Sequence, residues 1–155
     1  MKPYELDAAD RRILRELQND GALRNDILSE RIALTPAPTL RRVRALEAAG
    51  VIKRYAALLD PELVGLAVRV KVDVRLASQT RSEIDAFSKA VSAMTEVVEC
   101  MVLFGEWDFL LTVVARDVDD YQRFVFDKLS KTPGIATYRS TLILRMVKHT
   151  TVLPV

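Results

Sequence analysis

Basic side chains gather in one short stretch of this 155-residue chain. Positions 31–58 hold one acid, Glu47, against six basic residues: Arg31, Arg41, Arg42, Arg44, Lys53 and Arg54. In positions 61–155, by contrast, twelve Lys and Arg residues are balanced by twelve Asp and Glu residues. Cations concentrated in this way can pair with the phosphates of a polyanion, although a solvated charged face is the plainer alternative.

Residue types that support catalysis or metal binding are scarce. Cys100 and His149 are the only cysteine and histidine, and no Gly-rich phosphate loop occurs. A Ser-His-Asp mechanism or a metal site would need more, so we expect no catalytic residues and no metal. We expect Cys100 to be a buried small apolar residue and His149 to lie at the surface.

The single cysteine also excludes an internal disulfide, which fits a reducing compartment. Apolar runs are broken well short of the ~18 to 20 residues that a membrane span requires. Positions 1–20 alternate charged and apolar residues, unlike a signal peptide. These features together predict a cytoplasmic protein.

The middle of the basic stretch, with Arg41, Arg42 and Arg44, falls in the last of three predicted helices. Asp7 can cap the first helix, and its apolar stripe ends before Gly21. Asn25 can cap a short second helix that ends near positions 33–34. Thr35 and Pro36 then form the pattern of an N-cap followed by proline at the first helical position.

Helical spacing separates the third helix, positions 35–49, into two faces. Leu40, Val43 and Leu46 fall on one side, and the other side carries Pro38, Arg41, Arg42 and Ala45. We expect the apolar side to pack on the first two helices and the arginine side to face outward. Short helices with a tight connection and an exposed basic helix predict a helix-turn-helix, with the following extended segment as a small wing.

The remainder of the chain follows a different pattern after a turn-like linker around Pro61. Positions 68–76 alternate apolar and polar residues, which is typical of a half-buried strand. Further helices and strands are expected at 82–94, 97–104, 109–115, 118–129 and 138–147, and Gly105 is expected to supply unusual backbone angles in the hairpin loop. The order β-α-β-β-α-β predicts a ferredoxin-like domain over 61–155, after a helix-turn-helix domain over 1–60, and so an α+β protein.

Two long stretches of the chain read ILSERIALTPAPTLRRVRALEAAGVIKRYAALLDPELVG and VVECMVLFGEWDFLLTVVARDVDDYQRFVFDKLSKTPGI. They resemble the Lrp/AsnC ("feast/famine") transcription regulators of bacteria and archaea. The resemblance spans nearly the entire chain. It implies a winged helix-turn-helix that binds DNA and a C-terminal effector (RAM, αβ-barrel dimer) domain that pairs into dimers, with tetramers, octamers or larger rings common in the family.

In a helix-turn-helix, the third helix enters the major groove of double-stranded DNA, and arginines contact guanine or phosphate. Arg42 is the strongest candidate for such a contact, and Ala37 and Ala45 are small enough to permit close approach. A solvated helix with no ligand is the alternative. The candidate DNA-binding residues are Arg31, Thr35, Pro38, Thr39, Arg41, Arg42, Lys53 and Arg54.

The resemblance also implies that an amino-acid effector binds near the Gly-x-x-Asp hairpin of residues 105–108, at contacts between subunits. A zwitterion needs a carboxylate or carbonyl for its ammonium and N–H groups for its carboxylate. Asp108 or Glu106 can supply the first. The alternative is purely structural: Gly105 makes the turn, Trp107 caps the core and Asp108 caps the hairpin. The candidate effector-binding residues are Cys100, Phe104, Gly105, Glu106, Trp107, Asp108, Phe124, Lys128 and Thr141.

The function predicted from these features is an effector-modulated, sequence-specific transcription regulator of amino-acid metabolism that needs no cofactor and is not an enzyme. Two alternatives stay open. A nucleoid-type architectural protein would bend DNA with little sequence preference. Siroheme decarboxylases resemble the same two-domain architecture, but they are expected to offer histidines for the tetrapyrrole, and this chain has only His149.

Overall fold

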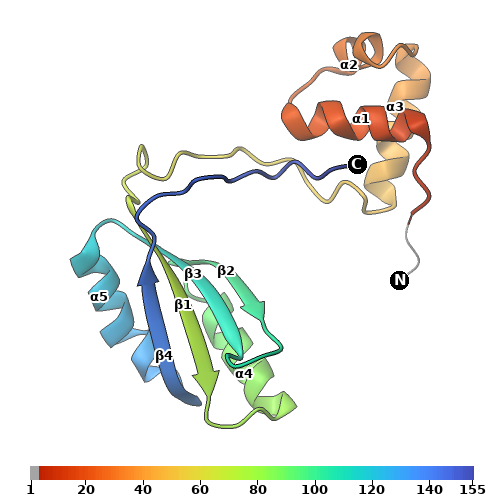
Figure 1. Ribbon diagram of the computed structural model, residues 1–155. Coiled ribbons are helices and arrows are strands. Elements are labelled where there is room, and N and C mark those ends of the chain that lie inside the picture. Colours follow the sequence, from red (N-terminus) through yellow and green to blue (C-terminus); the bar gives the residue numbers. More distant parts are fainter. Residues whose placement is uncertain (1–3) are drawn as a thin grey trace. The chain divides into compact units, whose positions relative to one another are not determined.

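The computed structural model describes residues 4–155, which form two compact units (Figure 1). The first unit extends to Leu58 and also includes Lys148–Val155, whereas the second unit is Leu59–Val147. The expected boundary near residue 60 is close to the structural one. Residues 148–155, which were expected in the second domain, pack on the first unit in this structure.

The first unit contains α1 (Ala8–Asn19), α2 (Asn25–Arg31) and α3 (Pro36–Ala48). Its core consists of fully or nearly buried aliphatic side chains from all of these helices: Ile13, Leu14, Leu28, Ile32 and Leu46. Leucine and isoleucine at helical spacing form one apolar stripe per helix, and these stripes meet in the interior. No helix within residues 4–155 combines the length and the hydrophobicity that crossing a membrane requires.

The starts of these helices follow the sequence with one exception. Asp7 caps α1 in a reciprocal capping box, in which its side chain accepts from the backbone N–H of Asp10 at 2.8 Å. Thr35 is the N-cap of α3 and Pro36 its first residue, as predicted. The N-cap of α2 is Arg24 and not Asn25, because the Asn25 amide instead donates to the carbonyl of Pro36 at 2.9 Å and so joins the starts of α2 and α3.

The C-terminal segment completes the first unit. Val155 packs against the core, and its backbone oxygen accepts from Arg15 Nε at 2.9 Å. The side-chain amide of Gln18 bonds to both the N–H and the C=O of Leu153. The segment therefore lies along α1 as part of the helical unit.

The second unit is an antiparallel sheet in the order β2-β3-β1-β4 with α4 and α5 on one face (Figure 1). Its elements are β1 (Val68–Leu76), α4 (Arg81–Ser92), β2 (Val97–Val102), β3 (Phe109–Ala115), α5 (Val118–Asp127), a 3-10 helix (Leu129–Lys131) and β4 (Ile135–Leu142). This arrangement confirms the ferredoxin-like prediction. The last strand starts and stops earlier than expected, because its pairing partner β1 begins at Val68 and offers little to pair with beyond Leu142.

Candidate nucleic-acid interface and effector hairpin

One stripe of α3 is exposed along its whole length. It consists of Ala37, Leu40, Arg41, Arg44 and Ala48, which recur at the spacing of a single helix face. The opposite side is anchored in the core by Thr39 and Leu46, both fully buried. The exposed stripe therefore carries two arginines away from the rest of the unit.

The helix is rotated by about one residue from the expected orientation. Thr39 was predicted to face DNA but is 0% exposed, and Leu40 was predicted to face the core but is 38% exposed. Burial of Thr39 is tolerated because its hydroxyl donates to the backbone oxygen of Thr35 at 3.0 Å. Thr39 is therefore removed from the candidates for direct contact with DNA.

Arg42 points toward α1. Its Nη1 atom lies 2.7 Å from Asp7 Oδ2 and 2.9 Å from Asp10 Oδ1, and 35% of its side chain is exposed. The backbone N–H of Asp10 and then the Arg42 guanidinium hold the pKa of Asp7 below its usual value. The capping box of α1 thus already holds the guanidinium of Arg42 in this arrangement, and its contact with DNA stays a prediction.

The other candidate DNA contacts are exposed to different degrees. Arg31 pairs with Glu16 at 3.0 Å in a solvent-exposed ion pair, and Pro38 is half-buried. Thr35, Lys53 and Arg54 are exposed. No strand is assigned between α3 and β1 within residues 4–155, so the wing carrying the last two of these residues is an extended segment without a sheet.

Tyr55 is a residue of this surface that sequence reasoning missed. Its hydroxyl donates to Glu47 Oε1 at 2.9 Å, so the one acid of the basic stretch is bound by a neighbour. Partial burial, followed by this hydrogen bond, raises the pKa of Tyr55 to about 12. A Cβ atom on Gly21 would lie 3.2 Å from the Tyr55 ring, so glycine there permits the close approach of the ring.

Asp108 fastens the hairpin between β2 and β3 to the end of β1. Its Oδ2 accepts from the backbone N–H of Leu76 at 2.7 Å, and its own N–H donates to the carbonyl of Val74 at 2.9 Å. Its carbonyl accepts from the N–H of Leu103 at 2.8 Å. The structural alternative for Asp108 is thus realised in this structure. Gly105 has no positive φ, so the expectation of unusual backbone angles at this position is wrong.

Two guanidinium groups lie close to the ring of Trp107. Arg75 and Arg139 have their Cζ atoms 5.2 Å and 5.0 Å from the ring centroid, within cation–π range. Arg75 also bonds to the backbone and carboxylate oxygens of Glu106. Both arginines come from positions that alternate with the buried residues of the sheet, so this cluster lies on the face without helices.

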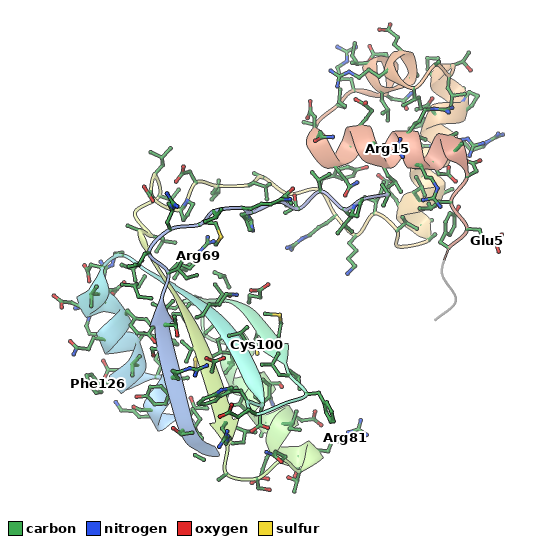
Figure 2. All side chains as sticks on the ribbon, in the orientation of Figure 1. Glu5, Arg15, Arg69, Arg81, Cys100 and Phe126 are labelled. Carbon is green, nitrogen blue, oxygen red and sulfur yellow. The ribbon has the colours of Figure 1, made fainter. Side chains whose placement is uncertain are left out.

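The remaining effector candidates are dispersed. Phe104 is fully exposed beside the hairpin, and Thr141 is exposed on β4. Phe124 is a residue of α5 buried in the core, and Lys128 pairs with Glu96, so neither lies in the hairpin cluster. Cys100 is exposed, contrary to the expectation of burial, because β2 is an edge strand of the sheet (Figure 2).

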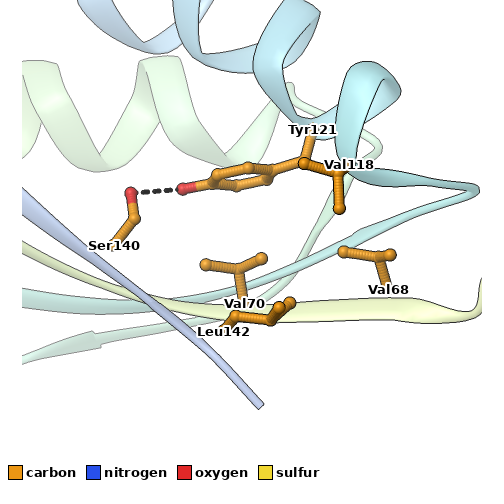
Figure 3. A pocket seen from close by; sticks show the side chains of 6 residues that line it. All are labelled: Val68, Val70, Val118, Tyr121, Ser140 and Leu142. Carbon is orange, nitrogen blue, oxygen red and sulfur yellow. Dashed lines mark hydrogen bonds between the residues drawn. The ribbon is translucent and has the colours of Figure 1, made fainter. Parts of the chain in front are cut away.

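A cavity of about 200 Å³ lies elsewhere, between α5 and the strands β1 and β4 (Figure 3). It is lined mainly by apolar side chains, with Tyr121 and Ser140 sharing a hydrogen bond: Val68, Val70, Val118, Tyr121, Ser140 and Leu142. This cavity is at the start of β1, whereas Asp108 bonds to residues near the end of that strand. It includes none of the candidate effector residues.

Two family models match the two parts of the chain, and the second model extends into the C-terminal segment that packs on the first unit. Residues 6–53 match the model for a winged helix-turn-helix DNA-binding domain, and residues 69–153 match that for the Lrp/AsnC ligand binding domain. The class defined by this fold and these sites is a DNA-binding transcription regulator with a separate ligand-binding domain. More narrowly, the chain belongs to the Lrp/AsnC family.

Individual relatives extend over almost the full length. The leucine-responsive regulatory protein of Rhizobium meliloti (strain 1021) is 42% identical over 93% of this chain and 92% of its own. A transcriptional regulator of Neisseria meningitidis, solved as a complex with L-Met, is 40% identical with a TM-score of 0.92, covering 97% of each chain. An AsnC family regulator from Agrobacterium tumefaciens is 38% identical with a TM-score of 0.91, covering 96% of this chain and 97% of its own.

Proposed function

We propose that this protein binds operator DNA through the exposed stripe of α3 and regulates genes of amino-acid metabolism in response to a bound amino acid. The observation that carries the DNA-binding part is the outward orientation of Arg41 and Arg44 on the third helix of a helix-turn-helix. Guanidinium groups on such a helix can fork onto guanine O6 and N7 or pair with phosphates. Lys53 and Arg54 are placed after the helix and would add contacts to the DNA backbone.

Arg41→Ala and Arg42→Ala form a matched pair that tests this orientation. Arg41→Ala is expected to weaken operator binding by roughly 1 to 3 kcal/mol without lowering the thermal midpoint, since Arg41 is exposed. Arg42→Ala is expected to lower the thermal midpoint, because it leaves Asp10 without its cation. Gel-shift titrations at fixed salt and thermal melts measure the two effects. Unchanged DNA affinity in Arg41→Ala would contradict the proposed interface.

For the effector, we propose an L-amino acid held at the hairpin of residues 105–108 where subunits meet. The complex of the Neisseria meningitidis regulator with L-Met supports this ligand class. The carboxylate of Asp108 already accepts a hydrogen bond from Leu76, so Glu106 is better placed to receive the ammonium group of the ligand. The ligand would then replace Arg75 as the ion-pair partner of Glu106. The sheet face without helices is the surface that we propose pairs two subunits, with tetramers or octamers built from those dimers.

Trp107 reports directly on this proposal, because it is the only tryptophan and adjoins Glu106. Titration with a panel of L-amino acids that includes methionine and leucine is expected to change its fluorescence for at least one member. Glu106→Gln is expected to weaken that response, and light scattering on the same samples measures the assembly size. If no amino acid changed either the fluorescence or the thermal midpoint, the effector site proposed here would be wrong.

A further inference from the structure

The exposed stripe of α3 has two chemically different halves. Its first half is apolar, with Ala37 and Leu40, and its second half carries Arg41 and Arg44. We propose that Leu40 contacts the 5-methyl group of a thymine in the major groove and so helps to determine which DNA sequence is bound. This inference rests on the proposed DNA-binding function and adds the class of base that is read.

The position of Leu40 is not explained by packing within the unit. The core side of α3 is already filled by Thr39 and Leu46, both fully buried, whereas Leu40 is 38% exposed. A single exposed leucine is unremarkable on most surfaces. Here it lies directly between the small side chain of Ala37 and the outward arginines, on the face proposed to enter the groove. An apolar side chain at that place meets base edges and not solvent once DNA is bound.

The first turn of α3 is poorly suited to holding a phosphate. A helix start can bind an anion through its unpaired backbone N–H groups. Pro36 and Pro38 have no N–H, and the N–H of Thr39 already bonds to the carbonyl of Thr35 at 3.2 Å. The loss of these donors favours apolar contact over phosphate binding at this end of the helix, and it leaves the base edge as the partner of Leu40.

Among the base edges of the major groove, thymine alone offers a methyl group in unmodified DNA. Leucine cannot form a hydrogen bond, so its discrimination must come from apolar contact with that methyl. Arg41 and Arg44 follow one and four residues later and can fork onto guanine nearby, whereas Arg42 is held by Asp7 and Asp10. The stripe therefore favours a half-site in which a thymine lies close to a guanine.

The test uses a duplex selected by the full chain from a random-sequence library, in which each thymine is replaced in turn by uracil. Uracil pairs identically and lacks only the methyl. We expect one replacement in each half-site to weaken binding about fourfold, the effect of losing one buried methyl group. In Leu40→Ala, the duplexes with thymine and uracil at that position are expected to bind equally, whereas Leu40→Met keeps the difference.

Ile27→Ala is the matched control, because Ile27 on α2 has the same exposed fraction, 38%, as Leu40. It is expected to retain the preference for thymine over uracil. The inference would be overturned if no uracil replacement weakened binding, or if Leu40→Ala kept the full preference. Selection of no duplex at all would instead overturn the proposed DNA-binding function, and the inference with it.

Discussion

Asp7 performs two tasks at the start of α1. Its carboxylate accepts the N–H of Asp10, which caps the helix, and it also receives the guanidinium of Arg42 from α3. Both contacts favour the ionised carboxylate, so the pKa of Asp7 is lowered in the folded protein. One side chain thus joins the first helix to the proposed recognition helix.

A pH dependence follows from this pKa. Because the folded pKa lies below the unfolded value of about 3.9, the stability that Asp7 contributes is fully present above that pH and is lost as the pH falls through the folded pKa. Asp7→Asn keeps a good N-cap but removes the charge. Thermal melts between about pH 2 and 6 should show a smaller loss of stability on acidification in Asp7→Asn than in the parent. Equal acid sensitivity would contradict the role of the charge.

For individual residues, the sequence predicted contacts between near neighbours in the chain well and contacts between residues far apart in the chain poorly. The Asp7 cap and the Thr35–Pro36 helix start are decided within a few residues, and both are confirmed. The ion pair between Arg42 and Asp10 joins residues 32 apart in sequence, and it depends on how α1 and α3 pack. The error at Thr39 has another origin: a threonine can be buried when a neighbouring carbonyl accepts its hydroxyl, which hydrophobicity alone does not reveal.

Among the elements, β1 is the one that organises the second unit. It pairs with β3 on one side and β4 on the other, and its register shifts between Arg75 and Leu76 where the hairpin residue Asp108 binds. The strict alternation of apolar and polar residues in 68–76 made this strand predictable. The hydrogen bond from the Leu76 N–H to Asp108 was not predictable, because it depends on the order of strands in the sheet and not on a local sequence pattern.

Replacement of Asp108 measures how much its hydrogen bond with Leu76 stabilises the protein. Asp108→Ala leaves the N–H of buried Leu76 without its acceptor, which is expected to cost about 1 to 3 kcal/mol in free energy of unfolding. Asp108→Asn retains an acceptor oxygen and is expected to cost less. Denaturant unfolding measures both. Equal stability of the alanine variant and the parent would show that the hydrogen bond to Leu76 is not needed to hold the hairpin.

The whole molecule consists of two units with separate hydrophobic cores, one built from helices and one between the sheet and its helices. Trp107 belongs to the second unit, and Gln18 belongs to the first. The two-domain order was predictable because the hydrophobic period changes along the chain. The return of residues 148–155 to α1 was not, since this segment shows no periodic pattern and its contacts lie about 135 residues away in sequence.

Separate cores predict separable unfolding. Gln18→Ala removes the hydrogen bonds to Leu153 and is expected to destabilise the first unit by roughly 1 kcal/mol. Far-UV circular dichroism, which follows helices in both units, should show part of its transition at a lower temperature. Tryptophan fluorescence, which reports only on the second unit, should keep its midpoint. A matching shift by both probes would mean that the units unfold together.

The packing of Val155 against the helical core also affects when the first unit can finish folding during translation. The helices α1, α2 and α3 leave the ribosome first, but the valine that packs on their core is added only after the entire second unit has been translated. The proposed DNA-binding unit therefore remains incomplete in a nascent chain. The core of this unit is completed only after the ribosome has synthesised the second unit, which is the part proposed to sense the amino acid.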